Sequence, residues 1–287
     1  VFPPLGTPDG TSNSRFSVFR IDYKKFNNQS LQTIIARKDD NGNIVAGALL
    51  DMEQILEQYR RQEHIAAIRA DIIVHSLGGL VSRGMPLLEP SRYFSEQTFG
   101  KGRIHKLITM DSPHKGSEYC NFLTNSYWAA DKEDREQMDA FLAEHILNDP
   151  TAPQNPISGG AVSDVNLDSK FLMMLNNSSE VMKQSPTHTI VGWSSPEQIF
   201  KNNLLVEAIS WFVIGQGRKT FQDIFGAQEH DLIVGEQSQM GRFVFDTPTS
   251  YTIFNNVTHS AGFFAEKPIV SDKSGSAARV LQLLNSR

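Results

Sequence analysis

Residues 71–83 read DIIVHSLGGLVSR and join a short apolar run to a glycine-rich turn. Ile72, Ile73 and Val74 are β-branched, which is typical of a parallel strand that is buried on both faces. The turn carries Ser76, and the apolar residues after Gly79 suit a helix. The segment therefore predicts a strand, a sharp turn and a helix, with a serine at the turn.

A serine in this position lies above the sheet with its hydroxyl in solvent. Small neighbours are needed because the strand and the helix approach closely. The pattern is that of a nucleophile elbow, usually written G-x-S-x-G. Val74 stands at the first glycine position, whereas Gly78 and Gly79 keep the second half intact. An ordinary strand–turn–helix corner is the alternative. We favour the elbow because the motif's strand and helix are both expected here.

The composition is that of an ordinary globular protein, with 39% hydrophobic and 21% charged residues in a chain of 287. A net charge of −5 gives no basic surface for nucleic acid and argues against an anionic membrane as the main partner. The single cysteine, Cys120, excludes an internal disulfide and is most simply a buried apolar residue. The chain starts at Val1 rather than at Met, so we expect the natural protein to extend further upstream.

Strands and helices are expected to alternate along most of the chain. Strands are predicted at residues 15–23, 70–74, 105–110, 188–192, 243–245 and 251–257, and helices at 46–69, from the elbow to Pro86, and at 131–148, 168–176 and 276–285. This alternation is typical of an α/β fold with a mostly parallel, doubly wound sheet. We expect a single domain over residues 1–287, with insertions at about 118–186 and 194–229 that form a cap or lid.

A serine hydroxyl is a poor nucleophile near neutral pH unless an imidazole takes its proton and a carboxylate orients that imidazole. On a sheet of this kind the three groups follow the chain order Ser, Asp or Glu, His. Among the eight histidines, only His259 is both late in the chain and directly behind an expected strand. An exposed loop histidine is the alternative, and the order rule favours His259 as the base.

At these residues the chain resembles the α/β-hydrolase superfamily, and specifically its lipase-like branch with a T-P-H-x-G-S motif. Residues 75–83 (HSLGGLVSR) look like the nucleophile segment, and residues 111–117 (DSPHKGS) look like the loop one strand later. Residues 231–234 (DLIV), with Ser238 and Gln239, are similar to the acid segment, usually D-G-x-V. The resemblance implies Asp231 as the acid. The order rule alone leaves Asp223, Glu236 and Asp246 open.

Two departures from the family pattern affect the expected site. Leu232 replaces the glycine after the acid, and no His-Gly loop precedes residues 15–23, where the chain offers only FPPLG at residues 2–6. Prolines have no N–H to donate. One oxyanion donor is therefore expected, the backbone N–H of Leu77, and the second is either near residues 5–6 or missing. Loss of one such donor typically lowers turnover by about 10²–10³.

The resemblance implies a serine hydrolase that cleaves carboxylic esters of lipids through an acyl-enzyme. The alternatives are a thioesterase or an inactive, hydrolase-like binding module. The expected partners are a small-molecule or lipid ester and, transiently, a membrane surface that residues 204–214 (LLVEAISWFVI) contact. His75, Trp211 and Phe212 are the substrate-binding candidates, although each could simply pack in the core. No cofactor or metal is expected, because the sequence has no phosphate loop, dinucleotide fingerprint or metal-spaced cluster.

Overall fold

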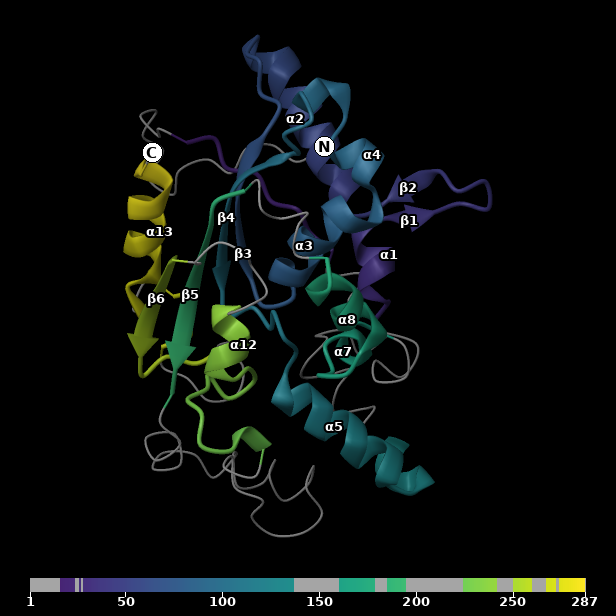
Figure 1. Ribbon diagram of the computed structural model, residues 1–287, viewed down its shortest axis with the longest axis vertical. Helices are drawn as coiled ribbons and strands as arrows, with labels where there is room; N and C mark the ends of the chain where they lie inside the picture. Colours follow the sequence, from purple (N-terminus) through teal and green to yellow (C-terminus); the bar gives the residue numbers. More distant parts are fainter. Residues whose placement is uncertain are drawn as a thin grey trace.

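The computed structural model describes residues 16–23, 26, 28–136, 160–178, 185–194, 224–241, 250–259, 267–271 and 274–286. Within them, the central sheet is four-stranded and parallel, in the order β3-β4-β5-β6 (Figure 1). Its strands are β3 (Ala70–His75), β4 (Ile104–Met110), β5 (Thr187–Trp193) and β6 (Ser250–Asn255). Because neighbours run parallel, the residues that follow β3, β4, β5 and β6 meet at one edge of the sheet.

Helices cover both faces of this sheet. Leu107 and Ile108 are adjacent on β4 and point to opposite faces. Leu107 belongs to a core cluster with α1 (Leu31–Ile35), α2 (Ala48–Glu63) and α3 (Gly78–Leu88). Ile108 belongs to a second cluster that includes Val280 of α13 (Ser276–Asn285). Figure 1 accordingly shows α13 on one side of the strands and α1 to α3 on the other. The predicted doubly wound α/β architecture is confirmed.

The other described elements come, in chain order, mostly between the helices and strands named above. Two short strands form an antiparallel hairpin, and α5, α7 and α8 lie between β4 and β5 in the chain. Their bounds are β1 (Arg37–Lys38), β2 (Ile44–Ala46), α4 (Pro90–Tyr93), η2 (Glu96–Thr98), α5 (Glu118–Ala129), α7 (Ala161–Asp164), α8 (Lys170–Asn176) and α12 (Glu236–Met240). No helix among the described residues is long and apolar enough to cross a membrane.

The strand prediction for residues 15–23 is wrong where the structure describes them, because residues 16–23 form no strand. Their side chains are anchored by packing instead. Phe19 lies edge-on to Tyr59 of α2, with ring centroids 5.3 Å apart, and the Ser17 hydroxyl hydrogen-bonds Tyr59. Ile21 and Tyr23 pack on the main core cluster. The apolar pattern therefore reflected contacts with helices and not pairing in the sheet.

Two further details differ from the sequence expectation. Ile73 is 43% exposed, so β3 is buried on one face only. The elbow helix continues past Pro86 to Leu88. The predictions for residues 243–245 and 204–214, and for most of the helix at 131–148, lie outside the described residues. The single-domain assignment and the cap boundaries stay predictions.

Candidate active site

The turn between β3 and α3 holds Ser76 in a left-handed backbone conformation, with φ 53°. Such a conformation is strained for a residue with a side chain and persists only where the surrounding structure enforces it. The Ser76 N–H donates to the carbonyl of Met110 at 3.0 Å, which fixes the turn against the end of β4. This is the backbone geometry that the elbow motif requires.

The two glycines after Ser76 are needed for close approach. A Cβ atom on Gly78 would lie 2.8 Å from Cβ of Val74, and one on Gly79 would lie 2.5 Å from Cβ of Ser112. Val74 is accommodated at the usual glycine position because residue 78 has no side chain. The presence of Val74 in place of the motif's first glycine thus has a local steric explanation.

Gly79→Ala is expected to destabilise the fold by about 1–3 kcal/mol, because the added methyl group collides with Ser112 and α3 must shift. Urea unfolding followed by circular dichroism measures the change. Gly100→Ala is the control, since a Cβ there meets nothing within 4 Å and only its positive φ resists substitution. A Gly79→Ala protein as stable as the wild type would contradict the steric account.

The structure brings Ser76, His259 and Asp231 together in one hydrogen-bonded chain. Nε2 of His259 lies 2.7 Å from Oγ of Ser76, and Nδ1 lies 2.7 Å from Oδ2 of Asp231. Because a carboxylate only accepts, Nδ1 carries the proton and Nε2 is left to accept from the serine hydroxyl. Asp231 is fully buried and His259 is 7% exposed, so water competes little for these hydrogen bonds.

Backbone groups hold the Asp231 carboxylate in place. Its Oδ1 accepts hydrogen bonds from the N–H groups of Ile233 at 2.9 Å and Val234 at 2.7 Å. Leu232, at the family's glycine position, has φ 84°. The backbone therefore keeps the glycine-like conformation, and burial of the leucine side chain (2% exposed) offsets its conformational cost.

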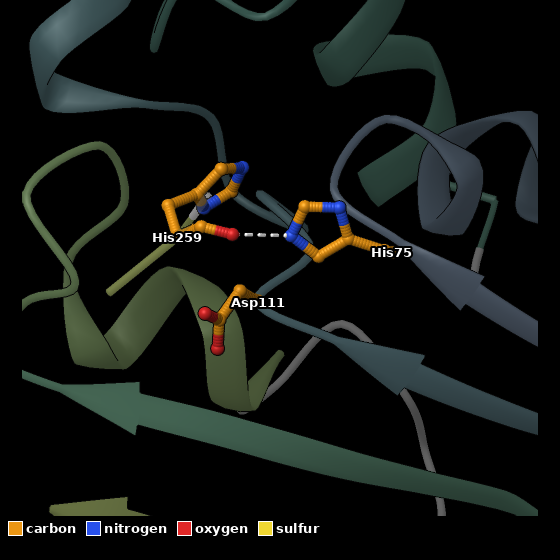
Figure 2. A group of neighbouring side chains, drawn as sticks. All are labelled: His75, Asp111 and His259. Atoms are coloured by element: carbon orange, nitrogen blue, oxygen red, sulfur yellow. Dashed lines mark hydrogen bonds between the residues drawn. The ribbon is translucent and has the colours of Figure 1, made fainter. Parts of the chain in front are cut away.

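His75 contacts the loop that carries His259. Its Nε2 donates to the carbonyl oxygen of His259 at 2.8 Å, and the two ring centroids are 4.8 Å apart (Figure 2). Burial is the main reason why the pKa of His75 falls to about 3, and the nearby His259 lowers it further. His75 is therefore neutral at physiological pH and anchors the His259 backbone. A substrate contact by His75 stays a prediction.

His75→Phe keeps a ring of similar size but removes the donor to the His259 carbonyl. We expect kcat to fall about tenfold through misplacement of the imidazole, with KM little changed. Steady-state kinetics on a chromogenic ester measures both values. Unchanged kcat in a folded His75→Phe protein would show that this hydrogen bond does not position His259.

The loop at residues 111–117 ties the nucleophile side of the site to the acid side. Ser238 of α12 donates to the Gly116 carbonyl at 2.6 Å, and Ser117 donates to the Ile233 carbonyl at 2.5 Å. The buried Arg83 of α3 donates to the His114 carbonyl at 2.9 Å. The motif that marked the family resemblance thus connects α3, the Asp231 loop and α12.

The remaining candidates fall into three groups. Leu77 is the N-cap of α3, where backbone N–H groups have no acceptor within the helix, as an oxyanion donor requires. Glu236 begins α12, and Asp231 is the acid that contacts His259. The other candidates, Asp223, Asp246, Trp211 and Phe212, lie outside the described residues. Residues 5–6 also lie outside them, so whether a second oxyanion donor is near these residues or missing stays open.

Sequence reasoning did not identify one further acidic residue at the site, Asp111. His75, Asp111 and His259 each offer a ligand atom within 4.8 Å of the others (Figure 2), a spacing that could suit a metal ion. However, both nitrogens of His259 and Nε2 of His75 already make the hydrogen bonds described above. A metal ion would have to displace them. The available signal for Asp111 was its position directly behind the strand next to the elbow strand.

The family model described as PGAP1-like alpha/beta domain matches residues 45–198, which is more than half of the chain. The chain belongs to this family. Comparison with curated protein sequences gave no match. The PGAP1-like domain also shares its fold with a solved phospholipase structure. The predicted α/β-hydrolase fold is therefore confirmed.

The solved structures are distant in sequence. Phospholipase PlaB from Legionella pneumophila in complex with thio-NAD has a TM-score of 0.52 at 10% identity, covering 94% of this chain and 49% of that chain. A second PlaB structure has a TM-score of 0.50 at 12% identity, covering 83% and 47%. The mature lipase BlEst2 from Bacillus licheniformis has a TM-score of 0.49 at 15% identity, covering 89% and 74%. The PGAP1-like chain thus spans about half of the Legionella protein, and the likeness shows the fold alone.

Proposed function

We propose that this PGAP1-like domain is a serine hydrolase that cleaves carboxylic esters of lipids. The observation that carries the proposal is the hydrogen-bonded chain from Oγ of Ser76 through His259 to Asp231, with both distances at 2.7 Å. A serine on a strained strand–helix turn, a buried imidazole in the required tautomer and a fully buried carboxylate are the parts that acyl transfer needs.

The proposed reaction has two halves. Oγ of Ser76 attacks the ester carbonyl while Nε2 of His259 takes the hydroxyl proton, and Asp231 stabilises the imidazolium. The Leu77 N–H donates to the oxyanion, and His259 then returns the proton to the leaving alcohol. An acyl group remains on Ser76. A water molecule, deprotonated by His259, attacks the acyl carbonyl, releases the carboxylic acid and restores the serine.

The choice of a lipid ester rests on the family and on apolar surface. The fold is shared with proteins described as lipases and phospholipases. Trp128 at the end of α5 is 57% exposed and Met173 of α8 is 49% exposed, and both belong to elements inserted between β4 and β5. Figure 1 shows α5 beyond the carboxyl ends of the strands, where sheets of this type bind ligands. Exposed apolar groups there suit an acyl chain and transient contact with a lipid surface.

A fluorophosphonate probe tests the proposal, because it phosphonylates only serines that are activated as nucleophiles. We expect stoichiometric labelling of the folded protein and complete loss of labelling in Ser76→Ala. Ser91→Ala, an exposed serine on α4, is the matched control and should label like the wild type. If the folded wild-type protein stays unlabelled, the proposal fails and the domain is better described as a binding module.

A further inference from the structure

A second carboxyl group, Asp111, lies beside the site and has no part in the reaction just described. It directly follows β4 and is fully buried, with φ 48°. Its Oδ1 accepts a hydrogen bond from the Gly192 N–H of β5 at 2.7 Å. A Cβ on residue 192 would lie 2.8 Å from Oδ2 and 2.9 Å from Oδ1 of Asp111. The glycine is therefore what lets β5 approach this carboxyl group.

The other oxygen of Asp111 is in an unfavourable position for a charged group. Oδ2 is buried and has no hydrogen-bond partner among the described residues. A buried carboxylate oxygen without a donor carries a large desolvation penalty. Nearby Asp231 is already well supplied with donors, from Ile233, Val234 and Nδ1 of His259. Of the two acids, Asp231 has the surroundings of an anion and Asp111 does not.

The groups that face Asp111 do not compensate a charge. Titratable groups beside it in the described part of the chain include Asp231 from the loop before α12, His75 from the end of β3 and His259 from the loop after β6 (Figure 2). α12 adds only the neutral Gln239, which shares the Gly192 N–H. Burial and the negative charge of Asp231 both raise the pKa of Asp111, and the Gly192 N–H opposes them.

We propose that Asp111 is a neutral carboxylic acid whose Oδ2–H donates a hydrogen bond to the Asp231 carboxylate. The two acids then carry one negative charge, and Asp111 is a positioning residue that fixes the carboxylate facing His259. The protonation is argued from the burial of Asp111, the missing donor at its Oδ2 and the neighbouring carboxylate, whereas the part of Asp111 in catalysis rests on the proposed function. A second negative charge at this point would keep more of His259 in the protonated form before the reaction, and that form cannot accept the proton of Ser76.

The pH dependence of stability tests the protonation without any activity. An aspartate ionises near pH 4 in an unfolded chain, so unfolding above that pH releases the proton that Asp111 retains in the folded protein. Wild-type stability should therefore fall relative to Asp111→Asn as pH rises. The unfolding constant of the wild type, divided by that of Asp111→Asn, should increase by up to about tenfold per pH unit between pH 5 and 7. Asp40→Asn, in the exposed β1–β2 turn, controls for the substitution. A ratio that is independent of pH would overturn the proposal.

Kinetics test the positioning role. Asp111→Leu should lose about tenfold or more in activity. Asparagine keeps the shape of the neutral acid and a donor, so Asp111→Asn should retain most of the activity that Asp111→Leu loses. The acidic limb of the kcat/KM profile should coincide in Asp111→Asn and the wild type. A shift of that limb to lower pH in Asp111→Asn would mean that Asp111 is ionised, and the proposal would be wrong. If no ester is hydrolysed and no probe binds, the proposed function fails, and the stability ratio still decides the protonation.

Discussion

His259→Ala is expected to lower kcat for ester hydrolysis by about 10⁴–10⁶, with a small change in KM. The reason is that Nε2 of His259 is the group within reach of the Ser76 hydroxyl, at 2.7 Å, and without it the serine has no base. The loss should appear in both kcat and kcat/KM, because the proton is transferred only in the transition state. Steady-state kinetics with a chromogenic ester measures the effect.

The matched control is His105→Ala, a histidine on β4 whose side chain is 59% exposed and pairs with Asp71. It should leave kcat within about twofold of the wild type, because exposed pairs of this kind contribute little. Equal losses in the two variants, or full activity in a folded His259→Ala protein, would remove His259 from the mechanism.

Asp231→Asn is expected to reduce kcat by about 10³–10⁴. An amide at this position can turn its NH₂ group toward Nδ1 of His259, which would favour the tautomer with the proton on Nε2. That tautomer cannot accept from Ser76. Circular dichroism and thermal unfolding should show a folded protein, since the amide oxygen can still accept from the N–H groups of Ile233 and Val234.

Glu236→Gln is the informative comparison for the Asp231 variant, because the order of residues in the chain did not separate these two acids. Glu236 begins α12 and should be replaceable with less than about a threefold change in kcat. If Glu236→Gln proved as damaging as Asp231→Asn, the hydrogen-bond geometry would be a poor guide to the acid.

Chain order and local stereochemistry predicted that Ser76 and His259 lie together, as the structure places them, and their catalytic roles stay predictions. Ser76 at a glycine-rich turn and His259 behind a strand were identifiable because parallel strands place their following loops at one edge. The departures from the family pattern at Val74 and Leu232 have local causes: the missing side chain at Gly78 accommodates Val74, and Leu232 adopts a glycine-like φ of 84°. The residues that fix these groups from farther along the chain were not identifiable.

The wrong predictions have a common physical origin. The apolar alternation of residues 16–23 fits a strand, yet Phe19 and Ser17 contact Tyr59 of α2. The β-branched run of β3 suits a strand buried on both faces, yet Ile73 is exposed on one of them. The pattern of apolar residues in a sequence indicates which side chains are to be buried, but tertiary packing determines which element covers them. The same limit applies to Asp111, whose protonation depends on the burial and charge that β5 and the Asp231 loop create.

Direct detection of an acyl-enzyme tests the central claim most sharply. The protein would be mixed with a slowly deacylating nitrophenyl ester, quenched in acid, digested with trypsin and analysed by fragment mass spectrometry. We predict the mass of the acyl group on the peptide of residues 70–83, localised to Ser76 and not to Ser82 in the same peptide. Ester turnover without an adduct on Ser76, or an adduct that persists in Ser76→Ala, would contradict the account.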